Sequence, residues 1–333
     1  MFNMIIQVKI EIFQNPVGRN VFMSVMNAEA LLFGLALGDA LGYPTEFLSL
    51  KEIKKHYGVQ GIQEPPTPAL YTDDTQMTLA LIKGMLEAGL TAAIDTQMQA
   101  ISRYFVEWLN SPENNRAPGN TCLSATRNLA AGQHWQQSGL DSKGCGAAMR
   151  VAPLGYFYQF YPDMLYRVAD ATAIITHNHP TARAAAIAAA YLVKLALDGV
   201  SPEAYLRKVM TFTDGLSDEL DYALLRVGHV LAWNDEESAL NHIGQGWVAD
   251  EAVALALYCV MRYPDDYVAC VRRAANTDGD SDSIACIAGG ISAARLGLDT
   301  IPLVWRERCE RRDELTTLAH QMAEARRSMQ ESN

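Results

Sequence analysis

The sequence predicts an all-α fold, with one compact domain from residue 27 to residue 333. Apolar residues recur at helical spacing in almost every segment after residue 27. The longest polar, proline-containing loop, residues 110–119, has apolar helical patterns directly on both sides. No sequence repeat and no low-complexity linker divides the chain, whose 333 residues are enough to bury a large core. These observations favour a single helical domain over two smaller ones.

Residues 1–26 are predicted to form an N-terminal extension. In residues 4–13, isoleucine and valine at the even positions alternate with polar residues, which is the clearest strand pattern in the chain. This short β-like segment has few evident partners among the predicted helices. Three interpretations stay open: an arm on the protein's own surface, an over-extended start before initiation at Met23 or Met26, or a strand added to another protein's sheet.

A helix rich in small residues is predicted from about Asn27 to Gly42. Gly34 and Gly38 lie one turn apart in it, and each lowers helix stability by about 1 kcal/mol relative to alanine. Glycine is favoured at such positions where another backbone approaches closely, so we expect this helix in a tightly packed region. Further helical patterns follow at residues 73–89, 95–109, 121–132, 164–177, 180–198, 202–212, 217–232, 249–262, 265–275, 283–296 and 312–329.

The composition argues against several classes of function. The formal net charge of -11 disfavours general nucleic-acid binding, because affinity for a polyanion comes largely from Lys and Arg. No uninterrupted apolar stretch reaches membrane length, and Lys9 and Glu11 interrupt the apolar region that a signal peptide needs. The six cysteines form no CxxC pair and lie mostly in apolar runs, which is typical of reduced thiols in a cytoplasmic protein.

Two clusters of acids and hydroxyls stand where predicted helices begin. They comprise Thr72, Asp73 and Asp74, and, about 200 residues later, Asp280, Asp282 and Ser283. Taken alone, the first cluster is an ordinary N-cap followed by acids that favour the helix dipole. The second cluster begins like an EF-hand, but Ser283 and Gly289 stand where that motif requires Gly and Glu. The question is therefore whether the two clusters meet in space.

If the clusters converge, they form a site for hard divalent cations. Carboxylates and hydroxyls are ligands suited to Mg²⁺ or Mn²⁺, whereas zinc prefers nitrogen and sulfur. Four or more carboxylates in a small volume repel one another unless cations bind or some of them are protonated. Two divalent ions would nearly balance the charge and could orient hydroxyls and activate water. Glu46 is a candidate further ligand or general base, and otherwise a surface glutamate.

Three loops carry the pattern of an anion or ligand site. The first contains Gly144, Cys145 and Gly146, whose small residues expose backbone N–H groups to an anion such as a pyrophosphate, although a simple tight turn fits equally well. A similar polar loop, residues 119–121, precedes a helix. Residues 176–180 concentrate polar groups between two helices, and their two histidines are too few for a zinc site.

Six motifs follow one another along residues 27 to 300. They are Gly34-Leu-Ala-Leu-Gly-Asp-Ala-Leu-Gly-Tyr-Pro-Thr-Glu46, Tyr71-Thr-Asp-Asp-Thr-Gln-Met77, Gly144-Cys-Gly-Ala-Ala-Met-Arg150, Thr176-His177, Gly246-Trp-Val-Ala-Asp-Glu251 and Asp278-Gly-Asp-Ser-Asp-Ser-Ile-Ala285. In this order they resemble the motifs of the ADP-ribosylglycohydrolase family. The resemblance implies an orthogonal multi-helix bundle and a dinuclear Mg²⁺ or Mn²⁺ centre that removes ADP-ribose from modified proteins or related conjugates.

Transferred by position, the resemblance implies a role for each site residue. A carboxylate, Glu46 or Asp74, would act as the catalytic base, with Glu46 at or beside the metals. The linked amino acid would be arginine, with serine linkage or O-acetyl-ADP-ribose as competitors. The metal ligands would be Thr72, Asp73, Asp74, Asp280, Asp282 and Ser283. ADP-ribose would contact Gly119, Asn120, Thr121, Gly144, Cys145, Gly146, Met149 and His177.

The chain departs from the family pattern in three places. Asp278 replaces a common glycine and Ser283 replaces a threonine, which keeps the hydroxyl. Cys145 stands where asparagine is frequent, and the segment at residues 4–13 has no family counterpart. Two alternatives to the hydrolase remain: an immunity protein that occludes an ADP-ribosyltransferase through residues 1–26, and a catalytically silent relative. The intact ligand positions argue against the second.

Overall fold

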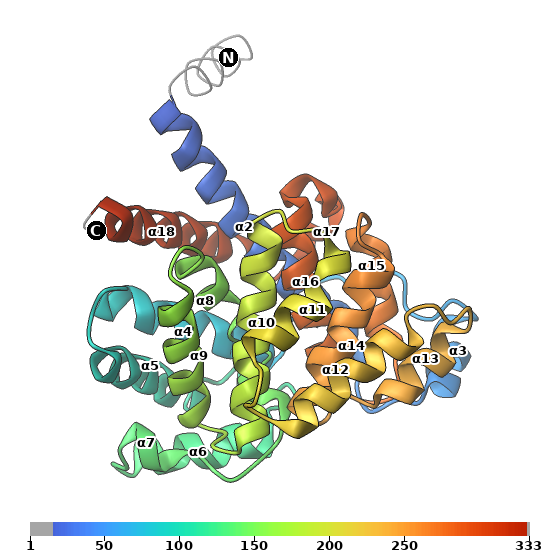
Figure 1. Cartoon of the computed structure of the whole chain (residues 1–333), viewed down its shortest axis with the longest axis horizontal. Helices are drawn as coiled ribbons and strands as arrows, with labels where there is room; N and C mark the ends of the chain where they lie inside the picture. Colours follow the sequence, from blue (N-terminus) through green and yellow to red (C-terminus); the bar gives the residue numbers. More distant parts are fainter. Residues whose placement is uncertain (1–15, 332–333) are drawn as a thin grey trace.

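The computed structural model describes residues 16–331, and it is built from helices (Figure 1). In this part of the chain the only β-pairing consists of isolated bridges, so the predicted all-α class is confirmed. The helices are α2 (Pro16–Gly42), η1 (Tyr43–Thr45), α3 (Leu50–Tyr57), α4 (Asp73–Ala88), α5 (Ile94–Leu109), α6 (Asn120–Ala130), α7 (Trp135–Ser138), η2 (Cys145–Ala147), α8 (Ala152–Phe157), α9 (Pro162–Ile174), α10 (Pro180–Leu197), η3 (Pro202–Ala204), α11 (Tyr205–Phe212), α12 (Asp218–Val230), α13 (Glu236–Ile243), α14 (Ala249–Arg262), α15 (Tyr267–Ala275), α16 (Ser281–Leu296), η4 (Leu298–Thr300), α17 (Leu303–Arg308) and α18 (Arg312–Glu331).

Part of the predicted N-terminal extension, residues 16–26, is helical. The strand predicted at residues 4–13 lies outside the described residues. Helix α2 begins at Pro16, well before the expected start at Asn27, and its first turns project from the body of the molecule in Figure 1. Proline is favoured in the first turn of a helix, and no further proline or glycine interrupts the chain between Gly18 and Gly34.

Apart from α2, the long helices lie within a few residues of their predicted ranges, whereas several of the short helices were not predicted. Helices α3, α8, α13 and α17 span only six to eight residues, which is too short for a clear apolar period. A capping signal was present for α3. Ser49 accepts a hydrogen bond from the backbone N–H of Glu52, and the Glu52 side chain accepts one from the N–H of Ser49.

Helices α2 and α16 pack antiparallel, backbone against backbone, at the centre of the fold. A Cβ atom added to Gly34 would lie 2.6 Å from the carbonyl oxygen of Gly289, and one added to Gly38 would lie 2.1 Å from that of Ala285. The predicted close approach at these two glycines is therefore confirmed. At the end of α2, a Cβ on Gly42 would lie 2.4 Å from the carbonyl oxygen of Ser281. The contact thus places the start of α16 beside the end of α2.

We expect Gly38→Ala to lower the free energy of unfolding by about 2–3 kcal/mol, because the added methyl group forces two closely packed helices apart. Gly290→Ala is the matched control on α16, since its Cβ would meet ordinary van der Waals neighbours at 3.5 Å or more. The midpoint and slope of urea unfolding measure both effects. Equal stability of the two variants would contradict the helix contact described above.

Two of the described helical segments reach the length and mean hydropathy of a membrane span, Phe22–Thr45 and Pro180–Leu197. Of the most apolar window in each, 78% and 72% is buried inside the protein, which is the burial of core helices. The prediction that no apolar stretch reaches membrane length was based on Lys194 and on the end of the stretch at Asp198-Gly199. Helix α10 extends through Lys194 and ends at Leu197. All six cysteines are free thiols, and all but Cys145 are buried.

Candidate active site

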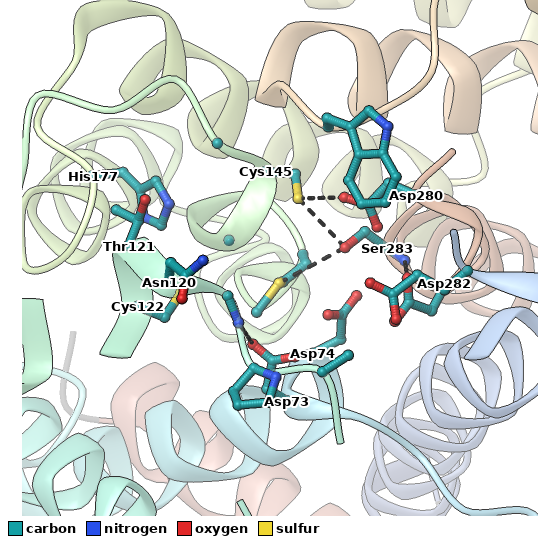
Figure 2. A pocket seen from close by; sticks show the side chains of 18 of the residues that line it. Asp73, Asp74, Asn120, Thr121, Cys122, Cys145, His177, Asp280, Asp282 and Ser283 are labelled. Carbon is teal, nitrogen blue, oxygen red and sulfur yellow. Dashed lines mark hydrogen bonds between the residues drawn. The ribbon is translucent and has the colours of Figure 1, made fainter. Parts of the chain in front are cut away.

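The two acidic clusters meet in one cavity of about 310 Å³ (Figure 2). The N-terminal ends of α4 and α16 supply four of the five acids, and Glu46 follows η1. The loops before α6 and around η2 form the opposite side. Figure 2 shows Asp280, Asp282 and Ser283 across the cavity from His177 and Thr121. The cavity is lined by Glu46, Phe47, Asp73, Asp74, Ala117, Pro118, Gly119, Asn120, Thr121, Cys122, Gly144, Cys145, Gly146, Met149, His177, Trp247, Asp280, Asp282 and Ser283. Every predicted site residue except Thr72 is among them.

The acidic end of the cavity is a cluster of carboxylates without a basic side chain among its lining residues. Oxygens of Glu46, Asp280 and Asp282 all lie within 4.8 Å of one another. Burial, and then the charges of Asp282 and Asp280, raise the pKa of Glu46 to about 10. Burial and Asp282 likewise raise the pKa values of Asp73, Asp74 and Asp280 well above their ordinary range. These shifts come first from burial and then from mutual repulsion, and a bound cation would relieve the repulsion.

The donor set of this cluster fits hard divalent cations. All its candidate ligand atoms are carboxylate or hydroxyl oxygens, as Mg²⁺ and Mn²⁺ prefer. Oε2 of Glu46 and Oδ2 of Asp74 are buried and accept no hydrogen bond. Buried carboxylate oxygens without partners are costly unless another group compensates them. The residues present are therefore compatible with the predicted metal centre.

Thr72 is held behind the cavity by a residue that the sequence did not single out, Asp39 of α2. The carboxylate of Asp39 accepts hydrogen bonds from the backbone N–H and the Oγ1 of Thr72, at 2.9 Å each. It also accepts bonds from the N–H and Oγ1 of Thr75, at 3.1 and 2.6 Å. Both threonines are completely buried. Asp39 thus fixes the first turn of α4, which carries Asp73 and Asp74 into the cavity.

Asp39 is itself fully buried in a helix of small and apolar residues. Burial and the charge of Asp282 raise its pKa to about 7, against the opposing effect of its threonine donors. A lone acid on the buried face of an apolar helix is a signal that could have been used, because a buried carboxylate needs donors. The sequence does not reveal that these donors lie at the start of another helix, more than thirty residues away.

The opposite end of the cavity consists of loops that present backbone N–H groups. Gly119 donates its N–H to Oδ2 of Asp73 at 3.2 Å, which joins this end to the acidic end. Gly144 donates its N–H to Oγ of Ser142 at 3.2 Å. A Cβ atom on Gly146 would lie 2.8 Å from Cε1 of His177, so only glycine fits there. The predicted glycine-rich loop therefore packs closely against the predicted histidine.

Arg150 holds this loop in place from the protein interior. Its completely buried guanidinium donates to the carbonyl oxygen of Gly146 at 2.8 Å and to Oγ1 of Thr176 at 2.7 Å, and lies over the ring of Phe105. Oγ1 of Thr176 in turn lies 2.8 Å from Nδ1 of His177. Burial and Arg150 lower the pKa of His177 to about 3, so its imidazole is neutral near pH 7.

Cys145 was predicted to contact ADP-ribose as part of the glycine-rich loop. In the structure its side chain also contacts the acidic end of the cavity. Its Sγ donates to Oδ2 of Asp280 at 2.8 Å and lies 3.5 Å from Oγ of Ser283 (Figure 2). Burial and Asp280 raise the pKa of the thiol well above its ordinary value, which keeps the proton on sulfur. The residue that replaces the family's frequent asparagine therefore still donates a hydrogen bond.

Five of the residues that line the cavity were not predicted as site residues. Ala117 and Pro118 precede the predicted Gly119 loop, and Cys122 follows it. The other two are aromatic, Phe47 and Trp247, and their rings stack with centroids 5.2 Å apart. Both lie inside or next to motifs that carried the family resemblance, directly after Glu46 and Gly246. Neither could be assigned to the cavity from spacing, because they are about 200 residues apart.

Comparisons with known proteins agree on one family. The sequence model described as ADP-ribosylglycohydrolase matches residues 26–332. The chain is 28% identical to the ADP-ribosylhydrolase ARH3 of Mus musculus, over 90% of this chain and 91% of that protein. It is 27% identical to the ADP-ribosylarginine hydrolase Tri1 of Serratia proteamaculans, over 90% of this chain and 79% of that protein.

A solved structure has the same fold. A chain of an ADP-ribosylglycohydrolase-related protein complex superposes with a TM-score of 0.68 at 28% identity, covering 91% of this chain and 98% of that one. The family match extends over almost all of the described residues, including both acidic clusters and the loops opposite them. The chain therefore belongs to the ADP-ribosylglycohydrolase family of enzymes.

Proposed function

We propose that this protein is a metal-dependent hydrolase that releases ADP-ribose from modified arginine side chains of proteins. The observation that carries the proposal is the meeting of two acidic helix starts with two glycine-containing loops in one cavity. The Serratia relative, named as an ADP-ribosylarginine hydrolase, supports the arginine linkage. Serine-linked ADP-ribose and O-acetyl-ADP-ribose are the competing substrates.

The metal centre of this proposal holds two Mg²⁺ or Mn²⁺ ions. Two divalent ions would nearly balance the negative charge of the five carboxylates at the acidic end. When bound, such ions polarise substrate hydroxyls and lower the pKa of water. Thr72 stays a predicted ligand, although its hydroxyl donates to Asp39 in the structure. The proposed ligands are Thr72, Asp73, Asp74, Asp280, Asp282 and Ser283, with Glu46 at or beside the ions.

In this proposal the loop end of the cavity binds the substrate, and the acidic end carries out the catalytic step. The N–H groups of Gly119 and Gly144 already donate to Asp73 and Ser142, so the backbone N–H groups of the residues that follow these glycines bind the diphosphate. The neutral His177 adds polar contact without charge. An unpartnered carboxylate oxygen of Glu46 or Asp74 accepts the proton of the attacking water. The acidic cluster stabilises the oxocarbenium-like charge that develops at the anomeric carbon.

The overall reaction adds water across the bond between the anomeric carbon and the guanidino nitrogen. The hydroxyl group of water goes to the anomeric carbon, and a proton goes to the nitrogen that leaves. The products are free ADP-ribose and unmodified arginine.

One assay tests reaction, linkage and metal together. We expect release of ADP-ribose from arginine-linked substrate with Mg²⁺ or Mn²⁺, slower release from serine-linked substrate, and none with EDTA. The variant combining Asp74→Asn and Asp280→Asn removes two carboxylates of the cluster while keeping their shape. Full hydrolysis of ADP-ribosyl-arginine by this variant in EDTA would overturn the proposal.

The immunity-protein alternative gains no support from the comparisons. It depends on the segment at residues 1–26, of which residues 1–15 lie outside the described part of the chain. We therefore do not propose a transferase partner.

A further inference from the structure

Two large aromatic side chains lie at the cavity in contact with solvent. Phe47 is 66% exposed and Trp247 is 38% exposed, and both line the cavity. Their rings stack with an interplanar angle of 21° and a centroid distance of 5.2 Å. An exposed aromatic ring adds little hydrophobic stabilisation to the fold, because much of its surface stays in water. A pair of such rings beside a polar cavity therefore indicates a binding surface rather than a packing role.

We propose that Phe47 and Trp247 form an aromatic platform that binds the guanidinium group of the arginine carrying ADP-ribose. The inference rests on the proposed hydrolase function and names residues that recognise its leaving group. The 5.2 Å spacing leaves no room between the rings for a third planar group, which needs about 3.5 Å on each side. The guanidinium therefore stacks on a free ring face of the pair.

The chain fixes both rings at the acidic end of the cavity. Phe47 directly follows Glu46, a member of the carboxylate cluster. Trp247 follows Gln245 and Gly246, and the carbonyl oxygen of Gln245 accepts a hydrogen bond from the N–H of Asp280 at 2.9 Å. A Cβ on Gly246 would lie 3.4 Å from Cβ of Asp280. The platform is thus joined to the carboxylate cluster at both Glu46 and Asp280. In the proposed function the scissile bond lies beside this cluster.

The loop that carries Trp247 is anchored independently. Oε2 of Glu251 accepts hydrogen bonds from the N–H groups of Gln245 and Gly246, at 2.9 and 3.2 Å. These bonds join the loop to the first turn of α14. Because the loop is held at both Glu251 and Asp280, Trp247 starts from a fixed backbone position, which reduces the entropy lost when a ligand stacks on it.

Phe47 adopts a backbone conformation that disfavours its side chain. Its φ is +65°, in the left-handed region that bulky residues rarely occupy. Glycine or asparagine would adopt this backbone conformation at a lower energetic cost. Because the side chain is exposed, its contribution to the stability of the fold does not explain why phenylalanine stands there. Strained residues of this kind are concentrated at ligand sites. We interpret the phenylalanine at this position as selected for contact with a ligand.

The chemistry of the site favours a guanidinium over the other planar groups of the substrate. A guanidinium is a flat cation that stacks on aromatic faces, and the nearby carboxylates of Glu46, Asp280 and Asp282 attract it. The adenine ring is also flat, but it is joined to the diphosphate, which the proposed function places at the loop end of the cavity. A serine leaving group is neither flat nor cationic.

The test compares substrate and product on the same variants. We expect Trp247→Ala to lower kcat/KM for ADP-ribosyl-arginine about tenfold, mainly through KM, and Phe47→Ala to lower it about fivefold. The dissociation constant of free ADP-ribose, measured by calorimetry with Mg²⁺, is expected to stay within twofold of the wild-type value. Trp247→Phe, which keeps an aromatic face, should restore most of the affinity for the arginine substrate.

Tyr222→Ala is the matched control, because Tyr222 is an aromatic residue as exposed as Phe47 that does not line the cavity. Unchanged kinetics of Trp247→Ala would overturn the platform, as would an equal loss of ADP-ribose affinity, which would assign the rings to adenine. A wild-type protein that releases no ADP-ribose from arginine would instead contradict the proposed function, so the two failures are distinguishable.

Discussion

Replacing Asp282 by asparagine is expected to lower kcat/KM for ADP-ribosyl-arginine at least about 10³-fold, which corresponds to about 4 kcal/mol of transition-state stabilisation. Asp282 is the carboxylate whose charge acts most strongly on Asp73, Asp74 and Asp280 after their own burial. Its loss removes a proposed metal ligand from the middle of the cluster. Mg²⁺ affinity, measured by calorimetry, should fall together with activity.

The same variant is expected to have the opposite effect on the stability of the metal-free protein. Without cations, Asp282 repels the neighbouring carboxylates, so Asp282→Asn should raise Tm in EDTA by about 2–4 °C. With saturating Mg²⁺ it should lower Tm relative to wild type, because less binding energy is available. Asp299→Asn, an exposed acid in η4, controls for the change in net charge. A variant that lowers Tm in both conditions would show that Asp282 is merely structural.

Asp39→Ala is expected to lower the free energy of unfolding by about 3–5 kcal/mol. The substitution leaves two backbone N–H groups and two hydroxyl groups, those of Thr72 and Thr75, buried without their acceptor. It also releases the first turn of α4, which presents Asp73 and Asp74. Urea unfolding measures the loss of stability, and Mg²⁺ titration of the folded fraction measures the effect on the site.

Two further variants test whether the loss of stability comes from the hydrogen bonds of Asp39. Asp39→Asn keeps one acceptor oxygen and nearly the same volume, so its loss of stability should be smaller than that of the alanine variant. Thr75→Val removes a single hydroxyl donor, and we expect a loss of about 1–2 kcal/mol. If all three variants unfold at the same urea concentration, Asp39 does not organise the start of α4.

The sequence predicted the parts of the site that have a local signature. Two acidic helix starts, a helix with two glycines one turn apart, and a glycine-rich loop each follow from spacing and residue type. The glycines at 34 and 38 even indicated the close helix contact that brings the clusters together. Helical periodicity predicted the long helices for the same reason, because three or more turns repeat the pattern.

Other features depend on contacts between distant segments and left no local trace. Asp39 is one acid in an apolar helix, and its partners lie on a different helix. Phe47 and Trp247 are single aromatic residues that meet only through the folded chain. The hydrogen bonds that Thr72 donates are also accepted by Asp39 rather than by the residues beside it. Such pairings are set by tertiary packing, which one sequence does not encode in its spacing.

The backbone contact between α2 and α16 also determines when the enzyme can first exist. These helices come from opposite ends of the chain, and during synthesis α2 leaves the ribosome long before α16 is made. Until then the glycine face of α2 has no partner, and Glu46, Asp73 and Asp74 have only half of their site. Because closing so long a loop must precede the contact, the active cavity forms as a late step in folding.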